Sequence, residues 1–301
     1  MRKQSGHPIS ILIPTRNDAC IQQVAALQKM ASAIEGLQYE IIVSDDNSTD
    51  SNAIAENSKI NELENCILLK HTENNGRAAN RNFLAQNAHY DWLLFLDCNV
   101  KIKNEDFLRK YLKNEGFSVV NGGIFAETDD NLAKHNLRYQ YEKKIEPNHV
   151  ASQRQQRPYQ SFRTSNFMVR RDVMLAHPLD ETVPGYGYED VLWGKTLSDN
   201  KISIAHIDNQ VTMTQFESNA AYVAKVEESM NTLYALSQEL NGYSQLLATV
   251  DRLKKKHLTT IFKLFFKPFA KFIRKKLTGN KPKIKYLNLY KLGYYLSIKE
   301  N

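Results

Sequence analysis

Cysteine is scarce in this sequence, and the positions of the few cysteines exclude two classes of domain. Cys20, Cys66 and Cys98 are the only three among 301 residues. No two of them form the Cys-x-x-Cys pair of a zinc or redox site, and their odd number and wide spacing give no disulfide framework. We therefore expect free thiols and a reducing compartment, which favours the cytoplasm.

Long apolar runs are also absent. A membrane-spanning helix needs roughly 18 or more consecutive apolar residues, and no segment approaches that length although 42% of the residues are hydrophobic. The apolar stretch at residues 9–13 is too short for a signal peptide and is expected to form a strand. The hydrophobic residues are therefore expected to build the core of one large domain, or of one domain with an appendage.

Acidic residues are nearly missing from the C-terminal part of the chain. Residues 252–301 contain 15 Lys and Arg against one acid, Glu300, which gives a net charge of +14, whereas the other residues hold 25 basic and 32 acidic side chains, a net of −7. Such an asymmetry predicts an anionic partner for the tail, either a membrane or a nucleic acid.

The tail also contains a predicted amphipathic helix. Between Leu258 and Leu277 most apolar residues fall on one face at about 100° per residue, with basic residues on the other, and Pro268 is expected to kink or divide the helix. We expect residues 251–301 to lie on an anionic membrane surface. Packing on the rest of the chain or on a partner subunit is the alternative. Nucleic acid is not expected, because no recognised binding module accompanies the tail.

Short apolar runs alternate with helical segments over the first half of the chain, which predicts an α/β fold with a mostly parallel sheet. The expected strands are residues 9–13, 39–43, 66–69, 92–96 and 117–120. Later elements are expected at residues 161–169 (a return to the sheet), 191–197 (helix), 202–207 (strand) and 219–247 (a long helix). Polar clusters follow four of the strands, at residues 14–18, 45–50, 74–77 and 97–99. Ligands bind beyond the carboxyl ends of strands in such sheets, so these clusters predict a binding site at one edge.

Six segments carry a resemblance to a known family: ISILIPTRND, EIIVSDDNSTD, NNGRAANRN, WLLFLDCNV, SNFMVRRDV and GYGYEDVLWGKTL. In their order and spacing they resemble the family 2 glycosyltransferases, over about residues 8–215. The resemblance implies a GT-A, Rossmann-like sandwich with a mostly parallel central sheet, here with a C-terminal helical basic extension. We accordingly expect a catalytic domain at residues 1–218, a helical extension at 219–250 and the membrane-associating tail at 251–301.

The resemblance also implies a donor site for a nucleotide-diphosphate sugar. Asp45 would hold the nucleotide, although an Asx turn that caps a helix is the alternative role for it, and Asp46 and Asp50 are expected to cap. The other expected nucleotide contacts are Pro14, Thr15, Arg16, Asn17, Arg77, Arg81 and Asp97. Arg77 and Arg81 suit a diphosphate at a helix start, and two solvated surface arginines are the alternative.

A metal site for Mn²⁺ or Mg²⁺ is implied at the Asp-x-Asp position, but this sequence departs from the pattern. Asp97 is present, whereas the neutral Asn99 replaces the second acid. Met213 occupies the place of a metal-binding histidine downstream, and His206 is a possible substitute. Hard divalent cations prefer carboxylate oxygens, so we expect weak metal binding, or compensation by Arg77 and Arg81.

The catalytic candidates are Asp190 as the base that deprotonates the acceptor hydroxyl and Glu189 as a positioning carboxylate. Acids at the start of a helix also favour its positive end, so capping is the alternative role for both. Asn166, Gly187, Tyr188 and Trp193 are expected to contact the sugar or the acceptor, with a core role for Trp193 as the alternative. The central expectation is that Asp45, Asp97 and Asp190 converge around a single cleft.

Together, the resemblance and the basic tail predict an inverting glycosyltransferase at the cytoplasmic face of a membrane, acting on a glycan or lipid-linked acceptor. Cutting the chain after about Asp251 is expected to leave a soluble body that still binds nucleotide. A sugar nucleotidyltransferase is disfavoured, because a Gly-rich turn would follow its first strand where this chain has Pro14-Thr15-Arg16-Asn17. A non-catalytic scaffold that binds nucleotide-sugar or glycan is the remaining alternative, favoured by Asn99 and Met213.

Overall fold

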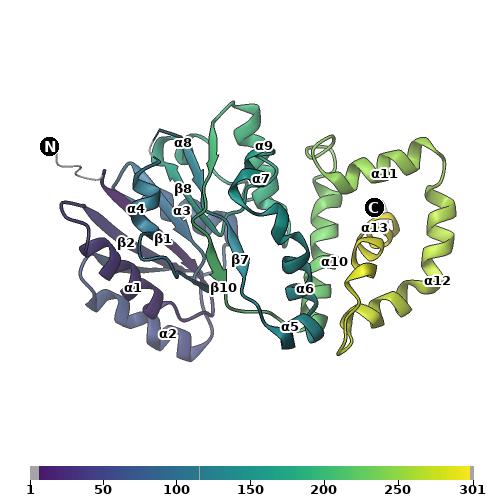
Figure 1. Ribbon diagram of the computed structural model, residues 1–301, viewed down its shortest axis with the longest axis horizontal. Coiled ribbons are helices and arrows are strands. Elements are labelled where there is room, and N and C mark those ends of the chain that lie inside the picture. The colour runs from purple at the N-terminus through teal and green to yellow at the C-terminus, as the bar shows by residue number, and fades with distance from the viewer. Residues whose placement is uncertain (1–6, 115, 299–301) are drawn as a thin grey trace. The chain divides into compact units, whose positions relative to one another are not determined.

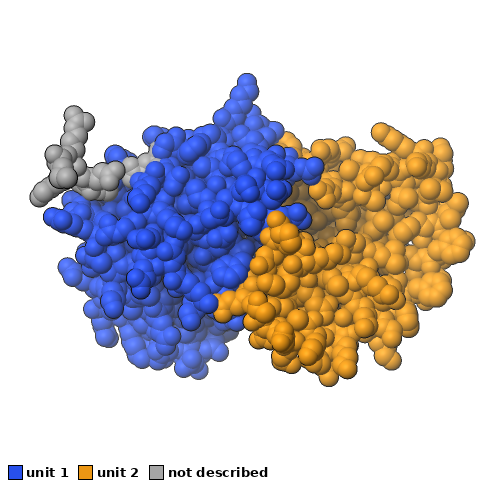
Figure 2. All heavy atoms as spheres, in the orientation of Figure 1, with its two compact units in different colours: residues 1–125, 148–181, 196–215 blue, residues 126–147, 182–195, 216–301 orange. Residues whose placement is uncertain are grey.

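The computed structural model describes residues 7–114 and 116–298, which fall into two units (Figure 2). Unit 1 comprises residues up to 125 together with 148–181 and 196–215, and unit 2 comprises 126–147, 182–195 and residues from 216 onward. These units differ from the three-part division expected from the sequence, because segments 126–147 and 182–195 group with the C-terminal helices. Each unit is therefore built from separate stretches of chain.

A seven-stranded sheet forms the centre of unit 1, with the order β3-β2-β1-β4-β8-β6-β9. Its strands are β1 (Ile9–Thr15), β2 (Tyr39–Asp45), β3 (Cys66–Lys70), β4 (Trp92–Leu96), β6 (Val119–Asn121), β8 (Asn166–Arg170) and β9 (Ile204–His206). The first four pair in parallel, β8 is antiparallel to both β4 and β6, and β6 is parallel to β9. The expected mostly parallel sheet is therefore confirmed.

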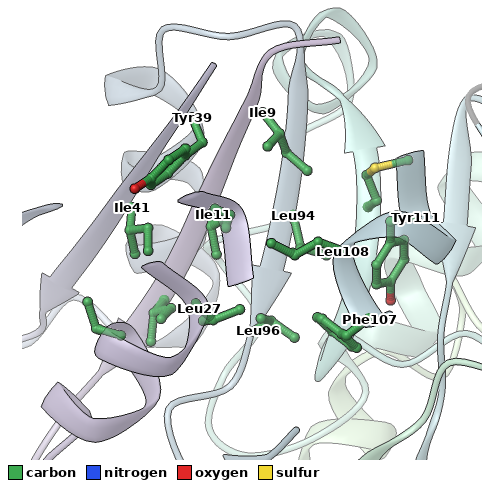
Figure 3. Packing of buried hydrophobic residues seen from close by; sticks show 14 of the residues in the cluster. Ile9, Ile11, Leu27, Tyr39, Ile41, Leu94, Leu96, Phe107, Leu108 and Tyr111 are labelled. Carbon is green, nitrogen blue, oxygen red and sulfur yellow. The ribbon is translucent and has the colours of Figure 1, made fainter. Parts of the chain in front are cut away.

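The helices of unit 1 bury alternate residues of these strands. They are α1 (Ile21–Ser32), α2 (Ser51–Ser58), α3 (Arg77–Asn87), α4 (Phe107–Leu112), α7 (Ala151–Gln155) and α8 (Arg171–Ala176). Figure 3 shows Leu27 of α1 and Phe107 of α4 over a layer of strand residues that includes Ile11 and Leu94. Since side chains alternate along a strand, the neighbouring Phe95 lies on the opposite face, where it stacks on Phe167 with ring centroids 4.9 Å apart.

A second, three-stranded sheet has the order β5-β10-β7. Its strands are β5 (Val100–Lys101), β7 (Ile124–Ala126) and β10 (Val211–Met213). The antiparallel pairing of β10 with β5 sets Met213 opposite Val100. This pairing brings residues 213–215 beside the segment that follows β4.

Unit 2 is helical. It contains α5 (Asp130–His135), α6 (Leu137–Ile145), α10 (Asn219–Ala235), α11 (Gln245–Lys255), α12 (Thr259–Thr278) and α13 (Leu287–Ser297), together with the start of α9 (Glu189–Asp199). The apolar face predicted for α10 is buried, but the helix ends at Ala235 and not near residue 247. The prediction was wrong there because turns fill the segment before Ser244, which caps α11 through the N–H of Leu247.

The helix α12 continues through Pro268 as one element, so a division into two helices was wrong. Its ribbon bends part-way along (Figure 1), in keeping with the expected kink. Phe266, Ile273 and Leu277 are buried against residues of α10 and α13, including Tyr222 and Tyr290. Within residues 7–114 and 116–298, no helix has the length and apolar character needed to cross a bilayer.

Candidate active site

The carboxyl ends of three neighbouring strands of unit 1 place polar side chains at one edge of the central sheet. Thr15 and Asp45 are register partners at the ends of β1 and β2. On the other side of β1, Leu12 pairs with Phe95 of β4, and Asp97 follows that strand directly. The edge predicted from the sequence is therefore present, with Thr15, Asp45 and Asp97 side by side across three strands.

Asp45 makes the turn that was its alternative role. Its Oδ1 accepts hydrogen bonds from the backbone N–H of Ser48 at 2.9 Å and from the Ser48 hydroxyl at 2.5 Å. Among the described residues its Oδ2 accepts no hydrogen bond, and the side chain is buried. The turn thus fixes the carboxylate and leaves one oxygen for a ligand.

Asn17 ties the loops after β1 and β2 together. It has a φ of 59°, its N–H donates to the Ser48 hydroxyl, and its Oδ1 accepts from the N–H groups of Thr49 and Asp50 at 2.7 and 3.0 Å. These contacts give Asn17 a structural role in the loops, and its expected contact with the nucleotide stays a prediction. Its exposed neighbour Arg16 lies on the same loop.

Asp46 stabilises the turn that leads into α3, a role that the sequence interpretation missed. Its two carboxylate oxygens accept from the N–H groups of Asn75 and Gly76 at 2.8 and 2.9 Å. Gly76 has a φ of 88°, which a glycine adopts without strain. Asp46 therefore holds the turn before α3, which begins at the exposed Arg77, and does not cap α2. The cap of α2 is Asp50, as expected.

Arg81 and Asp97 form an ion pair at this edge. Nη2 of Arg81 lies 2.6 Å from Oδ1 of Asp97, and Nη1 donates to the carbonyl of Arg77 at 3.2 Å. The Arg81 side chain is buried, whereas that of Asp97 is 29% exposed. Gln23 of α1 donates to the carbonyl of Asp97 at 3.0 Å. The sequence indicated both charges but not their pairing, so the acid expected to hold a metal is already neutralised by a guanidinium.

The pairing of β10 with β5 brings Met213, which lies opposite Val100, near Asn99. Thr214, directly after Met213, donates its hydroxyl to the carbonyl of Asn99 at 2.8 Å, and Gln215 donates to Asp18 at 3.3 Å. No group of three or more His, Cys, Asp or Glu side chains capable of holding a metal occurs among the residues described. Of the side chains expected to hold a metal, Asp97 is paired with Arg81 and Asn99 is a neutral amide, so metal binding stays a proposal.

Two residues expected at the site have other roles. Both ring nitrogens of His206 are engaged, one with Nη1 of Arg154 and the other with the carbonyl of Pro158, each at 2.8 Å. Asn166 is buried and accepts from the hydroxyl of Tyr111 at 2.6 Å, while its amide donates to two backbone carbonyls. Both ring nitrogens of His206 are thus occupied, so its expected role as a metal ligand was wrong, whereas the expected contact of the buried Asn166 with a sugar stays a prediction.

The segment from residue 10 to 176 matches the family described as glycosyl transferase family 2. The chain belongs to this family. It is a glycosyltransferase, and the interpretation drawn from its six sequence segments is confirmed.

Solved structures with the same fold support the assignment. The chain is similar to S. aureus TarS 1–349, with 15% identity, a TM-score of 0.50 and coverage of 96% of this chain and 89% of that one. It is also similar to the mannosyltransferase PcManGT from Pyrobaculum calidifontis in complex with GDP-Man and Mn²⁺, with 13% identity, a TM-score of 0.55 and coverage of 96% and 84%. At these identities the likeness establishes the GT-A fold. No curated protein sequence matches the chain.

The glycosyltransferase carries its catalytic candidates on a loop of unit 2 that α10 holds in place. Gly185, Gly187 and Tyr188 have φ values of 81°, 88° and 68°. Glu228 of α10 accepts from the N–H of Tyr186 at 2.9 Å, and Thr232 of α10 donates to the carbonyls of residues 184 and 186. A left-handed tyrosine stores backbone strain of order 1–3 kcal/mol, which the contacts with α10 sustain.

Glu189 and Asp190 form the first turn of α9 in this glycosyltransferase. Oδ1 of Asp190 accepts from the N–H of Val191 at 2.8 Å, so the capping contact that was its alternative role exists. Burial raises the pKa of the neighbouring Tyr188, and the charge of Asp190 adds to that rise. Trp193 of the same helix is buried. Glu189 and Asp190 belong to unit 2 and Asp45 and Asp97 to unit 1, so their convergence around one cleft stays a prediction.

The thiols near the edge are unsuited to nucleophilic chemistry. Burial raises the pKa of Cys20 to about 12, with the charges of Asp45 and Asp18 in the same direction. Burial likewise raises the pKa of Cys98. Both side chains therefore stay protonated at neutral pH, and the carboxylates are left as the candidate bases.

Proposed function

We propose that this glycosyltransferase moves a sugar from a nucleotide-diphosphate donor to a hydroxyl of a glycan or lipid-linked acceptor, in polysaccharide or glycoconjugate synthesis, with inversion at the anomeric carbon. The observation that carries the donor half of this proposal is the edge of the sheet in unit 1, where Thr15, Asp45 and the Arg81–Asp97 pair lie on adjacent strand ends. One TarS structure contains UDP-GlcNAc and the PcManGT structure contains GDP-Man. UDP- and GDP-sugars are therefore the first donors to test.

The donor would bind with its nucleotide beside β1 and β2. Oδ2 of Asp45 would accept a hydrogen bond from the base or ribose, and Pro14, Thr15 and Arg16 would line the pocket. The diphosphate would lie toward the start of α3, where N–H groups and the exposed Arg77 favour anions. Asp46 supports this arrangement because it holds the turn that leads into α3.

Mn²⁺ or Mg²⁺ is a proposed, weakly held cofactor. Asp97 and Asn99 would supply two oxygens and the diphosphate most of the others. A bound ion would offset the negative charge of the leaving diphosphate. Arg81 already places a positive charge against Asp97, and we propose that it shares this task, so that activity depends only partly on the metal.

Asp190 is the proposed base that accepts the proton of the acceptor hydroxyl, with Glu189 and Tyr188 positioning the acceptor. Attack from the face opposite the leaving group would invert the anomeric carbon. A carboxylate in this role contributes typically 10²–10⁴-fold to the rate. The strained loop fixed by α10 supports the proposal, because it holds the carboxylate in a defined place.

The test compares Asp190→Asn with Asp130→Asn, which also removes an acid from the first turn of a helix, α5. Nucleotide release from a panel of UDP- and GDP-sugars measures turnover, with Mn²⁺ or with a chelator. We expect Asp190→Asn to lower kcat by about 10²-fold or more and Asp130→Asn to leave it unchanged. Equal activity of both variants would assign Asp190 to capping alone. Absence of turnover with every donor in the wild-type chain would favour the scaffold that only binds nucleotide-sugar.

We further propose that the enzyme acts at the cytoplasmic face of a membrane, as the basic tail indicates. A lipid-linked acceptor would be presented there. Partition of the chain between cytosol and membrane fractions tests this location.

A further inference from the structure

The apolar residues of α12 are divided between two faces, where the sequence pattern placed them on one. Phe266, Ile273 and Leu277 point inward and are buried among residues of α10 and α13. The outward set is exposed and consists of Ile261 (51%), Leu264 (73%), Phe265 (68%), Phe269 (57%) and Phe272 (52%). Most of its members follow one another at intervals of three or four residues, so they form a stripe along the helix.

The inward face holds α12 firmly in unit 2. A Cβ atom added to Gly293 of α13 would lie 2.3 Å from the ring of Phe266, so the two helices approach closely at this glycine. Arg274 donates to Glu227 of α10 at 2.8 Å. In Figure 1, α13 lies between α10 and α12. The exposed stripe therefore lies on a helix whose other face is already packed in unit 2, so α12 is not a free amphipathic tail.

Exposed lysines accompany the stripe both before and after Pro268 of α12. Lys263, Lys267, Lys271, Lys275 and Lys276 are all exposed. Among the described residues from 252 to 298, the sequence contains no acid. The exposed part of α12 thus combines large apolar side chains with uncompensated positive charge.

This combination of apolar and basic side chains indicates which partner binds the exposed face of α12. An anionic bilayer accepts phenylalanine side chains at the boundary between headgroups and acyl chains and attracts lysines to the phosphates. A second copy of the chain would bring two positive surfaces together, and a nucleic acid would leave the stripe exposed to water. We propose that the outward face of α12, from Ile261 to Phe272, lies in the headgroup region of an anionic membrane with the helix parallel to the bilayer plane. This inference deepens the proposed location and is independent of the proposed chemistry.

The experiment measures co-sedimentation of the full chain with vesicles. Vesicles of phosphatidylcholine with about one-third phosphatidylglycerol are compared with pure phosphatidylcholine. We expect binding to the anionic vesicles only, weakened by salt. The variant Phe265→Ser/Phe269→Ser should abolish most of this binding. Lys263→Gln/Lys267→Gln should weaken it by roughly fivefold for each lysine, since each basic side chain near such a surface contributes about 1 kcal/mol.

Phe117→Ser is the matched control, because Phe117 is a similarly exposed phenylalanine (43%) in unit 1, and it should bind like the wild type. Circular dichroism and thermal melts verify that each variant is folded. Equal binding to neutral and anionic vesicles, or none to either, would overturn the proposal. So would a concentration-dependent dimer in light scattering that the Phe265→Ser/Phe269→Ser variant loses, since the stripe would then face a second copy. Vesicle binding requires no nucleotide-sugar donor, so the assay can be interpreted even if the proposed transfer reaction is not observed.

Discussion

Replacement of Gly187 by alanine tests whether the strained loop positions the catalytic carboxylate. Gly187 has a φ of 88°, and a Cβ atom there would lie 3.0 Å from the Cβ of Ser229 on α10. The left-handed backbone costs an alanine roughly 1–2 kcal/mol, and the crowded contact adds on the order of 1 kcal/mol. Reduced entropy of the unfolded chain returns about 0.4–1 kcal/mol. The expected loss of unfolding free energy is therefore about 1–3 kcal/mol.

Gly242→Ala separates strain from crowding. Gly242 has a φ of 73°, but its added Cβ would meet no atom within 4 Å. The two variants thus share the backbone penalty, and only Gly187→Ala pushes the loop away from α10. A displacement of about 1 Å can lower the rate on the order of 10²-fold, so we expect kcat to fall in Gly187→Ala and to stay near wild type in Gly242→Ala.

The double variant Gly187→Ala/Ser229→Gly provides a rescue. Removing the side chain of Ser229 relieves the contact but places a glycine inside α10, which costs about 1 kcal/mol more. Activity should therefore recover while stability falls further. The assays are nucleotide release for kcat and urea unfolding for stability. If Gly187→Ala and Gly242→Ala have equal kcat when fully folded, the loop does not position the reacting groups and the reasoning fails.

Two further predictions follow from unit 1. Burial lowers the pKa of His206 from 6.5 to about 4, with the charge of Arg154 acting in the same direction and the carbonyl of Pro158 opposing it. Because the pKa is lower in the folded than in the unfolded chain, the contribution of His206 to the unfolding free energy is fully present above pH 6.5. It should fall by about 3 kcal/mol as the pH decreases toward 4. His206→Gln should flatten this part of the pH profile in urea unfolding, and an unchanged slope would contradict it. Arg81→Gln should weaken nucleotide binding, measured by calorimetry, by roughly tenfold or more and more severely in chelator than in Mn²⁺, whereas an equal loss in both conditions would show that Arg81 does not share the task of the metal.

The sequence predicted the sheet well because its strands are short, apolar and separated by helices. Residues 39–43 and 92–96 became β2 and β4 within two residues at either end. The strand expected at residues 117–120 begins only at Val119, since Phe117 is exposed. The second sheet was not predicted, because strands of two or three residues such as β5 and β10 contain no readable alternation.

The candidate site was predicted in its residue types but not in its contacts. The ends of β1, β2 and β4 brought Thr15, Asp45 and Asp97 to one edge as parallel topology requires. The ion pair between Arg81 and Asp97 joins residues 16 positions apart, and no local pattern indicates such a pairing. Nor does a local pattern indicate that Asp46 accepts hydrogen bonds from the turn before α3, since the composition of its segment favoured a role for Asp46 as a helix cap. His206 was misassigned because a polar side chain that satisfies a buried interior resembles a ligand in a sequence.

The packing of α10 affects when this enzyme becomes complete during synthesis. The loop that carries Asp190 depends on Glu228 and Thr232 of α10, and the apolar face of α10 is covered in turn by Phe266 of α12 and Leu287 of α13. A chain ending near Asp251 would lack both covering helices, so it would expose that face and loosen the loop that it supports. During synthesis, the loop that carries Asp190 is therefore expected to gain its full support only after α13 has been made and has packed on α10.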